Sequence, residues 1–144
     1  MIDIFTTGGT IDKVYFDALS EYQIGATALP DMLQENNVFV AHRVTQLMRK
    51  DSLDMTDEDR MRIREAVLAT EEDRILITHG TDTMAETGRS LAGIENKTVV
   101  MTGSMQPARL RVSDAIFNIG FAIAALQQLQ PGVYIAMNEI VRAH

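Results

Sequence analysis

The sequence predicts an α/β fold, a doubly wound parallel sheet of about five strands in a single domain. Short apolar runs alternate along the chain with stretches that have a helical period. The runs are apolar on both faces, which is typical of parallel strands that helices cover on both sides. The length of 144 residues suits one domain with a core of its own.

The first part of the chain contains two predicted strands and one short helix. Residues 2–6 form an apolar run that predicts the first strand. Residues 11–28 carry polar residues and glycine without a sustained period, so we expect a loop there. Pro30 suits the first turn of a short helix that ends near Asn36. Valines and a phenylalanine within residues 38–44 then predict a second strand.

The middle of the chain predicts a helix, a strand and the start of another helix. Thr56 is a good N-cap, and the three acids that follow it suit the positive end of a helix dipole. The stripe expected to face the core of this helix, residues 56–70, consists of Ile63, Ala66, Val67 and Thr70. Residues 74–78 predict the third strand. Thr83 and Glu86 have the spacing of a capping box, so a helix is expected to begin there.

The last elements complete the predicted sheet and indicate where a ligand would bind. Residues 98–102 predict the fourth strand, residues 113–130 a helix that is apolar almost all round, and residues 133–137 the fifth strand. In such open sheets, ligands bind beyond the carboxyl ends of the strands. The segments expected at these ends are residues 7–11, 50–55, 79–83 and 103–107. All four are rich in hydroxyl groups, glycine or acid, so we expect the functional site there.

Composition and charge narrow the function. The formal net charge of -7 argues against nucleic acid or an anionic membrane as a partner, because both would repel the chain. No apolar run approaches the length of a membrane span, and the start lacks the basic region of a signal peptide, so we expect a cytoplasmic protein. There are no cysteines, and no His, Asp and Glu set has metal-ligand spacing, so no metal and no cofactor are expected.

Two of the segments at predicted strand ends carry the clearest chemistry. Thr7-Gly8-Gly9-Thr10 would let a ligand approach backbone N–H groups, although a tight turn alone would also explain its glycines. After the third strand, we interpret His79 as a hydrogen-bonded structural residue and Thr83 as a helix cap. Capping needs only one of the adjacent groups, which leaves Thr81 and Asp82 for function.

Taken together, these segments resemble the two signature segments of the L-asparaginase family. The first reads Thr7-Gly8-Gly9-Thr10-Ile11 and the second His79-Gly80-Thr81-Asp82-Thr83. The resemblance continues through residues 51–56, 99–107 and 113–114 in the family's order and spacing. It therefore covers nearly the whole chain and implies the family's amino-terminal, catalytic domain, of the doubly wound α/β type.

The resemblance also implies roles for individual residues. Thr10 would be the nucleophile that attacks the side-chain amide carbon, and Asp82 would pair with the ammonium group of the substrate. Ser52 would hold the α-carboxylate. The catalytic set that the resemblance implies is Thr10, Tyr22, Thr81 and Asp82, with Tyr22 on a mobile loop that closes the site. The substrate-binding set is Gly9, Ser52, Gly80, Thr81, Asp82 and Ser104, with Ser104 lining the pocket through its backbone.

This sequence departs from the family's pattern in two respects. The family's catalytic lysine lies a few residues beyond the fifth strand, and the sequence ends at His144, short of that point. Lys97 begins the fourth strand, at the end away from the predicted site, so it is not a substitute. The second, smaller domain of the family is absent from the 144 residues. Because a neighbouring subunit's second domain helps to complete the site in that family, we expect a homo-oligomer by analogy.

The leading hypothesis is an amidohydrolase that converts the side-chain amide of L-asparagine, or of a close analogue, to L-aspartate and ammonia. A threonine nucleophile, activated by a neighbouring base, and backbone donors for the oxyanion suit this chemistry. One alternative is a non-catalytic amino-acid-binding or regulatory module. Another is the deamidating part of an amidotransferase. The expected partners are a small amino acid and further copies of the chain.

Overall fold

The structure, a computed structural model, describes residues 1–16, 21–138 and 140–143. Among these residues one sheet has six strands in the order β4-β1-β5-β6-β7-β8. Their bounds are Ile2–Gly8 for β1, His42–Lys50 for β4, Arg74–Thr78 for β5, Thr98–Thr102 for β6, Gly132–Met137 for β7 and Ile140–Ala143 for β8. The first five are mutually parallel, and β8 runs antiparallel to β7. The predicted α/β class is confirmed.

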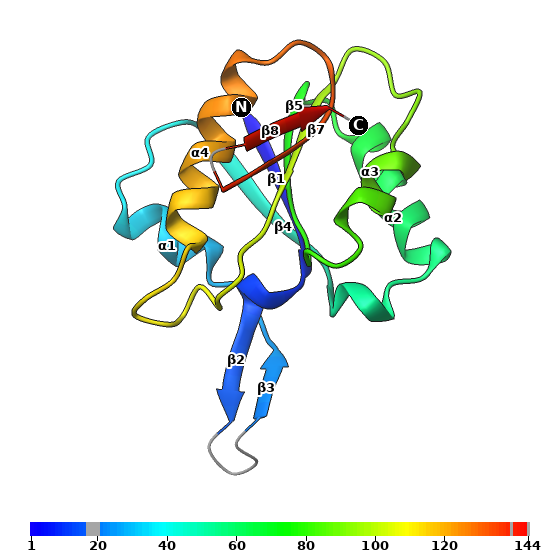
Figure 1. The fold of residues 1–144 in the computed structure, drawn as a ribbon. Helices are drawn as coiled ribbons and strands as arrows, with labels where there is room; N and C mark the ends of the chain where they lie inside the picture. Colours follow the sequence, from blue (N-terminus) through cyan, green and yellow to red (C-terminus); the bar gives the residue numbers. More distant parts are fainter. Residues whose placement is uncertain (17–20, 139, 144) are drawn as a thin grey trace.

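Helices cover both faces of the sheet, as Figure 1 shows. Helices α1 (Leu29–Glu35) and α4 (Ala115–Gln128) lie on one face, and α2 (Asp57–Ala69) and α3 (Met84–Ser90) lie on the other. The strand residues that pack with α1 and α4 include Ile4, Leu76 and Val100. Their sequence neighbours Phe5, Ile77 and Met101 pack with α2 and α3. Alternate side chains point to opposite faces, so each strand is apolar on both sides.

The strand order places a switch point between β1 and β5. After β1 the chain adds β4 on one side, then crosses over to add β5, β6 and β7 in turn on the other. The connections therefore reverse direction at β1, whose neighbours are β4 and β5. In folds of this type the ligand crevice opens at the carboxyl ends of the strands where the order reverses. The segments that follow β1 and β5 meet at this point.

The predicted cap of α2 is present. The Thr56 hydroxyl accepts a hydrogen bond from the Asp59 N–H at 3.2 Å, and the Asp59 carboxylate accepts one from the Thr56 N–H at 2.9 Å. The two residues thus satisfy each other's amide groups. The short helix at Pro30 and the apolar helix α4 are also present. Burial of α4 was expected on all sides, but one side is exposed, because Ile116 and Phe117 face solvent.

The expectation of a loop over residues 11–28 is wrong in part. A short 3-10 turn, η1 (Thr10–Asp12), leads into β2 (Lys13–Phe16), which pairs antiparallel with β3 (Glu21–Ile24). Figure 1 shows this pair extending away from the main sheet. Strands of four residues are too short to show a clear alternating pattern, so neither β2 nor β3 could be recognised from hydrophobic periodicity.

The edge strands were also difficult to predict. The second strand was expected from residue 38, but β4 begins at His42, and the Val38 N–H closes a turn after α1 by donating to the Leu33 carbonyl at 3.1 Å. Strand β4 is mostly polar and β8 is wholly exposed. An edge strand needs no continuous apolar run, so the sequence pattern showed neither where β4 begins nor that β8 is present.

None of the described helices is long and apolar enough to cross a membrane.

Candidate functional site

Close contacts at three glycines bring the strand ends together. A methyl group at Gly9 would lie 2.5 Å from the Gly80 nitrogen, and one at Gly8 would lie 2.4 Å from the Lys50 nitrogen. A methyl group at Gly80 would lie 2.7 Å from the Cβ and Oγ of Ser52. Side chains would force these segments apart, so the residues after β1, β4 and β5 can meet only because glycine stands at the contacts.

Thr10 and Thr81 follow the two touching glycines. Gly9 has φ 83° and accepts a hydrogen bond from the Asp12 N–H at 3.1 Å, which forms η1 with Thr10 as its first residue. Thr10 and Thr81 are both half-buried. The contact between Gly9 and Gly80 therefore places the two predicted catalytic threonines directly after a shared backbone junction. Thr7, by contrast, is buried and donates to the Thr78 carbonyl at 2.7 Å, so it is structural.

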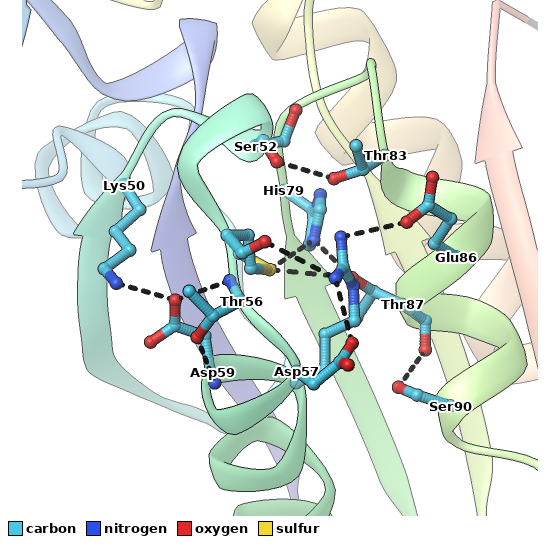
Figure 2. A network of polar contacts seen from close by, with 12 residues as sticks. Lys50, Ser52, Thr56, Asp57, Asp59, His79, Thr83, Glu86, Thr87 and Ser90 are labelled. Carbon is cyan, nitrogen blue, oxygen red and sulfur yellow. Dashed lines mark hydrogen bonds and ion pairs between the residues drawn. The ribbon is translucent and has the colours of Figure 1, made fainter.

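Ser52 lies against Gly80 with its hydroxyl group buried. It begins a 3-10 turn, η2 (Ser52–Asp54), and its carbonyl accepts a hydrogen bond from the Thr83 hydroxyl at 2.8 Å, drawn in Figure 2. Among the described residues, the buried side-chain polar atoms without a hydrogen-bond partner are Thr6 Oγ1, Ser52 Oγ, Thr78 Oγ1 and Thr102 Oγ1. Each such hydroxyl costs about 1–3 kcal/mol in a folded protein, and all four lie at or near the carboxyl ends of neighbouring strands.

The loop between β5 and α3 differs from its prediction at the cap. Thr83 is the N-cap of α3, but its side chain makes no capping hydrogen bond and instead donates to Ser52. Glu86 points to Arg60, at 3.4 Å, so the predicted capping box is wrong. Thr83 and Glu86 thus bind residues distant in the sequence, Ser52 and Arg60, and not each other's backbone. Asp82 is exposed, which leaves its carboxylate open to a ligand from solvent.

His79 is structural, as the sequence predicted. Its side chain is fully buried beneath the loop, with Nδ1 2.7 Å from the Gly80 carbonyl oxygen. Nε2 lies 2.7 Å from the Thr87 hydroxyl (Figure 2). Burial lowers the pKa of His79, the hydrogen bond to Gly80 raises it, and the charge of Arg60 lowers it further. The net effect is a pKa below 6.5, so the ring is neutral at pH 7.

The same arrangement of strand ends occurs in known proteins. A family model described as asparaginase, N-terminal, matches residues 1–144. The chain belongs to the asparaginase family. The L-asparaginase of Thermococcus kodakarensis is 36% identical, over 92% of this chain and 42% of that protein. L-asparaginase 1 of Escherichia coli is 37% identical, over 78% of this chain and 36% of that protein.

Solved structures agree with this assignment. The thermostable L-asparaginase from Thermococcus kodakarensis superposes with a TM-score of 0.84 at 30% identity, over 99% of this chain and 45% of that one. The probable cytoplasmic L-asparaginase from Campylobacter jejuni gives a TM-score of 0.80 at 28% identity, with the same coverage of 99% and 45%. This chain spans less than half the length of these asparaginase-family relatives.

The remaining residues that the family resemblance selects are placed less directly. The Ser104 hydroxyl is used within its own loop, where it donates to the Gln106 carbonyl at 2.5 Å, so only its backbone is free to face a ligand. A methyl group at Gly103 would lie 2.3 Å from the His79 carbonyl oxygen, so this loop also packs on the strand end of β5. The backbone of Tyr22 lies in β3, paired with Tyr15, but its side chain is outside the described part of the structure.

Lys97 lies at the opposite end of the sheet from the candidate site, as expected. Its ammonium group donates to the carbonyls of Thr70 at 2.5 Å and Glu72 at 3.1 Å, beside the amino end of β6. It therefore cannot assist Thr10. Lys50 is closer to the candidate site, because its backbone lies against Gly8, but its ammonium group pairs with the Asp59 carboxylate at 2.6 Å.

Asp12 is a residue that sequence reasoning missed. It shares η1 with Thr10 and is only 3% exposed. Burial raises the pKa of Asp12 to about 6, although Thr27, the backbone of Gly8 and the charge of Arg109 lower it. An acid two residues after the signature threonine was the available signal. Its burial depends on distant segments, which the local pattern does not reveal.

Proposed function

We propose that this chain supplies the nucleophile and most of the substrate-binding groups of an L-asparaginase. The observation that carries this proposal is the contact of Gly9 with Gly80 at the switch point, because it joins the segments of Thr10 and Thr81. The two relatives and the two solved structures described above are all named L-asparaginases, which supports the same substrate class. The relatives are more than twice as long as this chain, so we propose the full activity for a protein of their length.

The proposed reaction hydrolyses the side-chain amide of L-asparagine in two steps. The Thr10 hydroxyl attacks the amide carbon, and its proton passes to the amide nitrogen, which leaves as ammonia. Water then cleaves the ester to give L-aspartate and the free Thr10 hydroxyl. Backbone N–H groups beside the glycines would stabilise the oxyanion. Asp82, exposed at the loop, would pair with the substrate ammonium group, and the buried Ser52 hydroxyl would donate to the α-carboxylate.

Ammonia release from L-asparagine tests the proposal. We expect Thr10→Ala to lower the rate by about a thousandfold or more, because the attacking oxygen is lost. Thr10→Ser should keep measurable activity, because it retains the hydroxyl group. Thr7→Ser is the matched control, since Thr7 bonds only to the Thr78 carbonyl. The assay is run on the 144 residues and on a chain extended at its carboxyl end. Absence of turnover in both chains refutes the enzyme.

An amino-acid-binding module is the second candidate. The observation that favours it is that neither Lys97 nor Lys50 is placed to activate Thr10, since Lys97 bonds to the carbonyls of Thr70 and Glu72 and Lys50 pairs with Asp59. Such a module would bind L-aspartate without releasing ammonia from asparagine, and Thr10→Ala would change affinity alone. Thr81→Val separates the two functions, because an enzyme loses turnover and keeps aspartate binding when a group acts only in the transition state.

We also propose a homo-oligomer and a cytoplasmic location. Large apolar side chains are exposed on the segment that leads into α4 and on its first turn, namely Leu110, Val112, Ile116 and Phe117. Such a patch is typical of an interface. Light scattering after size exclusion tests the oligomeric state, and a monomer at high concentration refutes the homo-oligomer.

The proposed cytoplasmic location is based on the name of the Campylobacter jejuni protein, whereas a Haemophilus influenzae relative is named probable L-asparaginase periplasmic. Cell fractionation decides between the two.

A further inference from the structure

A continuous series of hydrogen bonds runs from Arg60 on α2 to the backbone of the candidate site. The Arg60 Nε donates to the Thr87 hydroxyl at 3.2 Å, and this hydroxyl lies 2.7 Å from His79 Nε2. His79 Nδ1 lies 2.7 Å from the Gly80 carbonyl oxygen. Figure 2 shows Thr87 and His79 facing one another beneath the loop that carries Thr83. His79 and Thr87 are fully buried, so water does not compete for these bonds.

The partners determine where the protons lie. A carbonyl oxygen can only accept, so at 2.7 Å from Gly80 the Nδ1 atom must carry a proton. The other neutral tautomer would place two acceptors against each other inside the protein. The doubly protonated ring is also unfavourable, because burial and the charge of Arg60 both oppose it. The neutral ring with a proton on Nδ1 remains.

The other half of the series fits the same tautomer. His79 Nε2 is then an acceptor, and the Thr87 hydroxyl donates to it. Arg60 has only donors, so its Nε–H fills the lone pair that Thr87 has left. The Met55 sulfur lies 3.2 Å from His79 Nε2 and 3.6 Å from the Thr87 oxygen. A thioether is a weaker acceptor than an imidazole nitrogen or a hydroxyl group, so the 2.7 Å contact between Thr87 and Nε2, and not the sulfur, decides which atom donates. Every bond of the series therefore has one donor and one acceptor.

Arg60 is itself held by two helices. Its guanidinium group lies 3.4 Å from the Glu86 carboxylate on α3 and 3.8 Å from Asp57 on α2, and it lies 3.4 Å from the Met55 carbonyl oxygen. The side chain is almost buried, and these acceptors compensate for its desolvation. Arg60 thus offers its Nε–H to Thr87 from a fixed position.

We propose that His79 is a positioning residue whose Nδ1 proton, fixed through Thr87 and Arg60, holds the Gly80–Thr81 peptide in the geometry of the site. Gly80 must lack a side chain because Ser52 occupies the space, yet glycine has the most mobile backbone. The bond from His79 restores the orientation that glycine alone would leave free. Because the peptide is planar and trans, fixing its carbonyl also fixes the Thr81 N–H. The link to ligand binding rests on the function proposed above.

Nuclear magnetic resonance of the ¹⁵N-histidine-labelled protein tests the tautomer directly. His42→Asn and His144→Asn leave His79 as the only labelled histidine. We expect Nδ1 to show a bound proton and Nε2 the shift of an unprotonated nitrogen at pH 7. A proton on Nε2, or on both nitrogens, overturns the proposal. This measurement needs no change at the site itself.

Three variants of α3 test the positioning role. Thr87→Val keeps the shape but removes the donor to His79, and we expect the Thr81 amide signal to shift and L-aspartate affinity to fall about fivefold to tenfold. Thr87→Ser should restore both. Ser90→Ala is the matched control, because its hydroxyl bonds only to the Thr87 carbonyl at 2.6 Å. An unchanged Thr81 amide in Thr87→Val, or an equal effect of Ser90→Ala, refutes the role.

The design separates this proposal from the proposed function. If the parent protein does not bind L-aspartate, the proposed function fails, and the tautomer with the Thr81 amide signal still decides the role of His79. If Thr87→Val does not fold, the tautomer of the parent protein decides it alone. If affinity falls while the Thr81 amide stays in place, the ligand effect has another origin and the positioning role is wrong.

Discussion

Replacing Asp12 by Asn tests the electrostatics beside the proposed nucleophile. Burial raises the pKa of the Asp12 carboxyl from 3.8 to about 6, against the hydrogen bond from Thr27 and the charge of Arg109. Between these two pH values the folded protein binds more protons at Asp12 than the unfolded chain does. Stability must therefore fall as pH rises through this window, and the contribution is constant above it.

The magnitude follows from the difference in pKa. A rise from 3.8 to about 6 corresponds to about 3 kcal/mol of stability lost once the carboxyl group is ionised. Asn has nearly the same shape and carries no charge, so Asp12→Asn avoids this loss. The variant should gain about 3 kcal/mol relative to the parent between about pH 3 and pH 7.5, with most of the change between about pH 4 and pH 6. Any pH-independent effect of the amide cancels in this comparison.

Urea unfolding of both proteins at a series of pH values measures the effect. Asp3→Asn is a control of opposite sign, because burial raises the pKa of Asp3 but hydrogen bonds from Arg43 and Thr70 outweigh it and hold the pKa below 3.8. Asp3 therefore stabilises the fold above its unfolded pKa and loses that effect as pH falls. A difference between parent and Asp12→Asn that varies by less than about 1 kcal/mol over the range would refute the reasoning.

Three further predictions concern the loop, the junction and the fold. Asp82→Asn should weaken L-aspartate binding by about tenfold or more, since a charged partner of the ammonium group is lost, and calorimetry that finds equal affinity contradicts the assignment. Gly80→Ala should abolish that binding in a folded protein, because the methyl group would lie 2.7 Å from Ser52, whereas Gly120→Ala, with no atom within 4 Å, should leave binding intact. Thr56→Ala should lower stability by about 1 kcal/mol in urea unfolding, because α2 loses its cap; no change would remove the capping box as a source of stability.

The sequence predicted best those features that depend on neighbours along the chain. The cap at Thr56 lies within four residues of its partner, and the buried strands β5 and β6 are apolar on both faces. The segments at the strand ends were also predictable, because a parallel sheet places all carboxyl ends at one edge. Gly9 and Gly80 could therefore be assigned to one site before their contact was known.

Features that depend on distant contacts were not predictable. Glu86 could have capped α3, but Arg60, 26 positions earlier, takes its carboxylate, and Thr83 bonds to Ser52. The raised pKa of Asp12 likewise needs burial by segments that contain Thr27 and Arg109. A local sequence pattern shows which residue could form a cap, but not the distant side chain that binds it instead. The same holds for edge strands such as β8, whose stability comes from pairing with β7.

Residues with an unfavourable conformation, contact or burial lie together at the carboxyl end of the sheet. Gly9 needs a positive φ, Gly80 touches Ser52, and Asp12 is buried with a raised pKa. The unpartnered buried hydroxyls of Thr6, Ser52, Thr78 and Thr102 lie there too. At α2, by contrast, the cap is complete and Arg60 has several acceptors. A sequence selected only for stability would not concentrate unsatisfied groups at one edge of the sheet, and the ligand binding proposed above would account for all of them together.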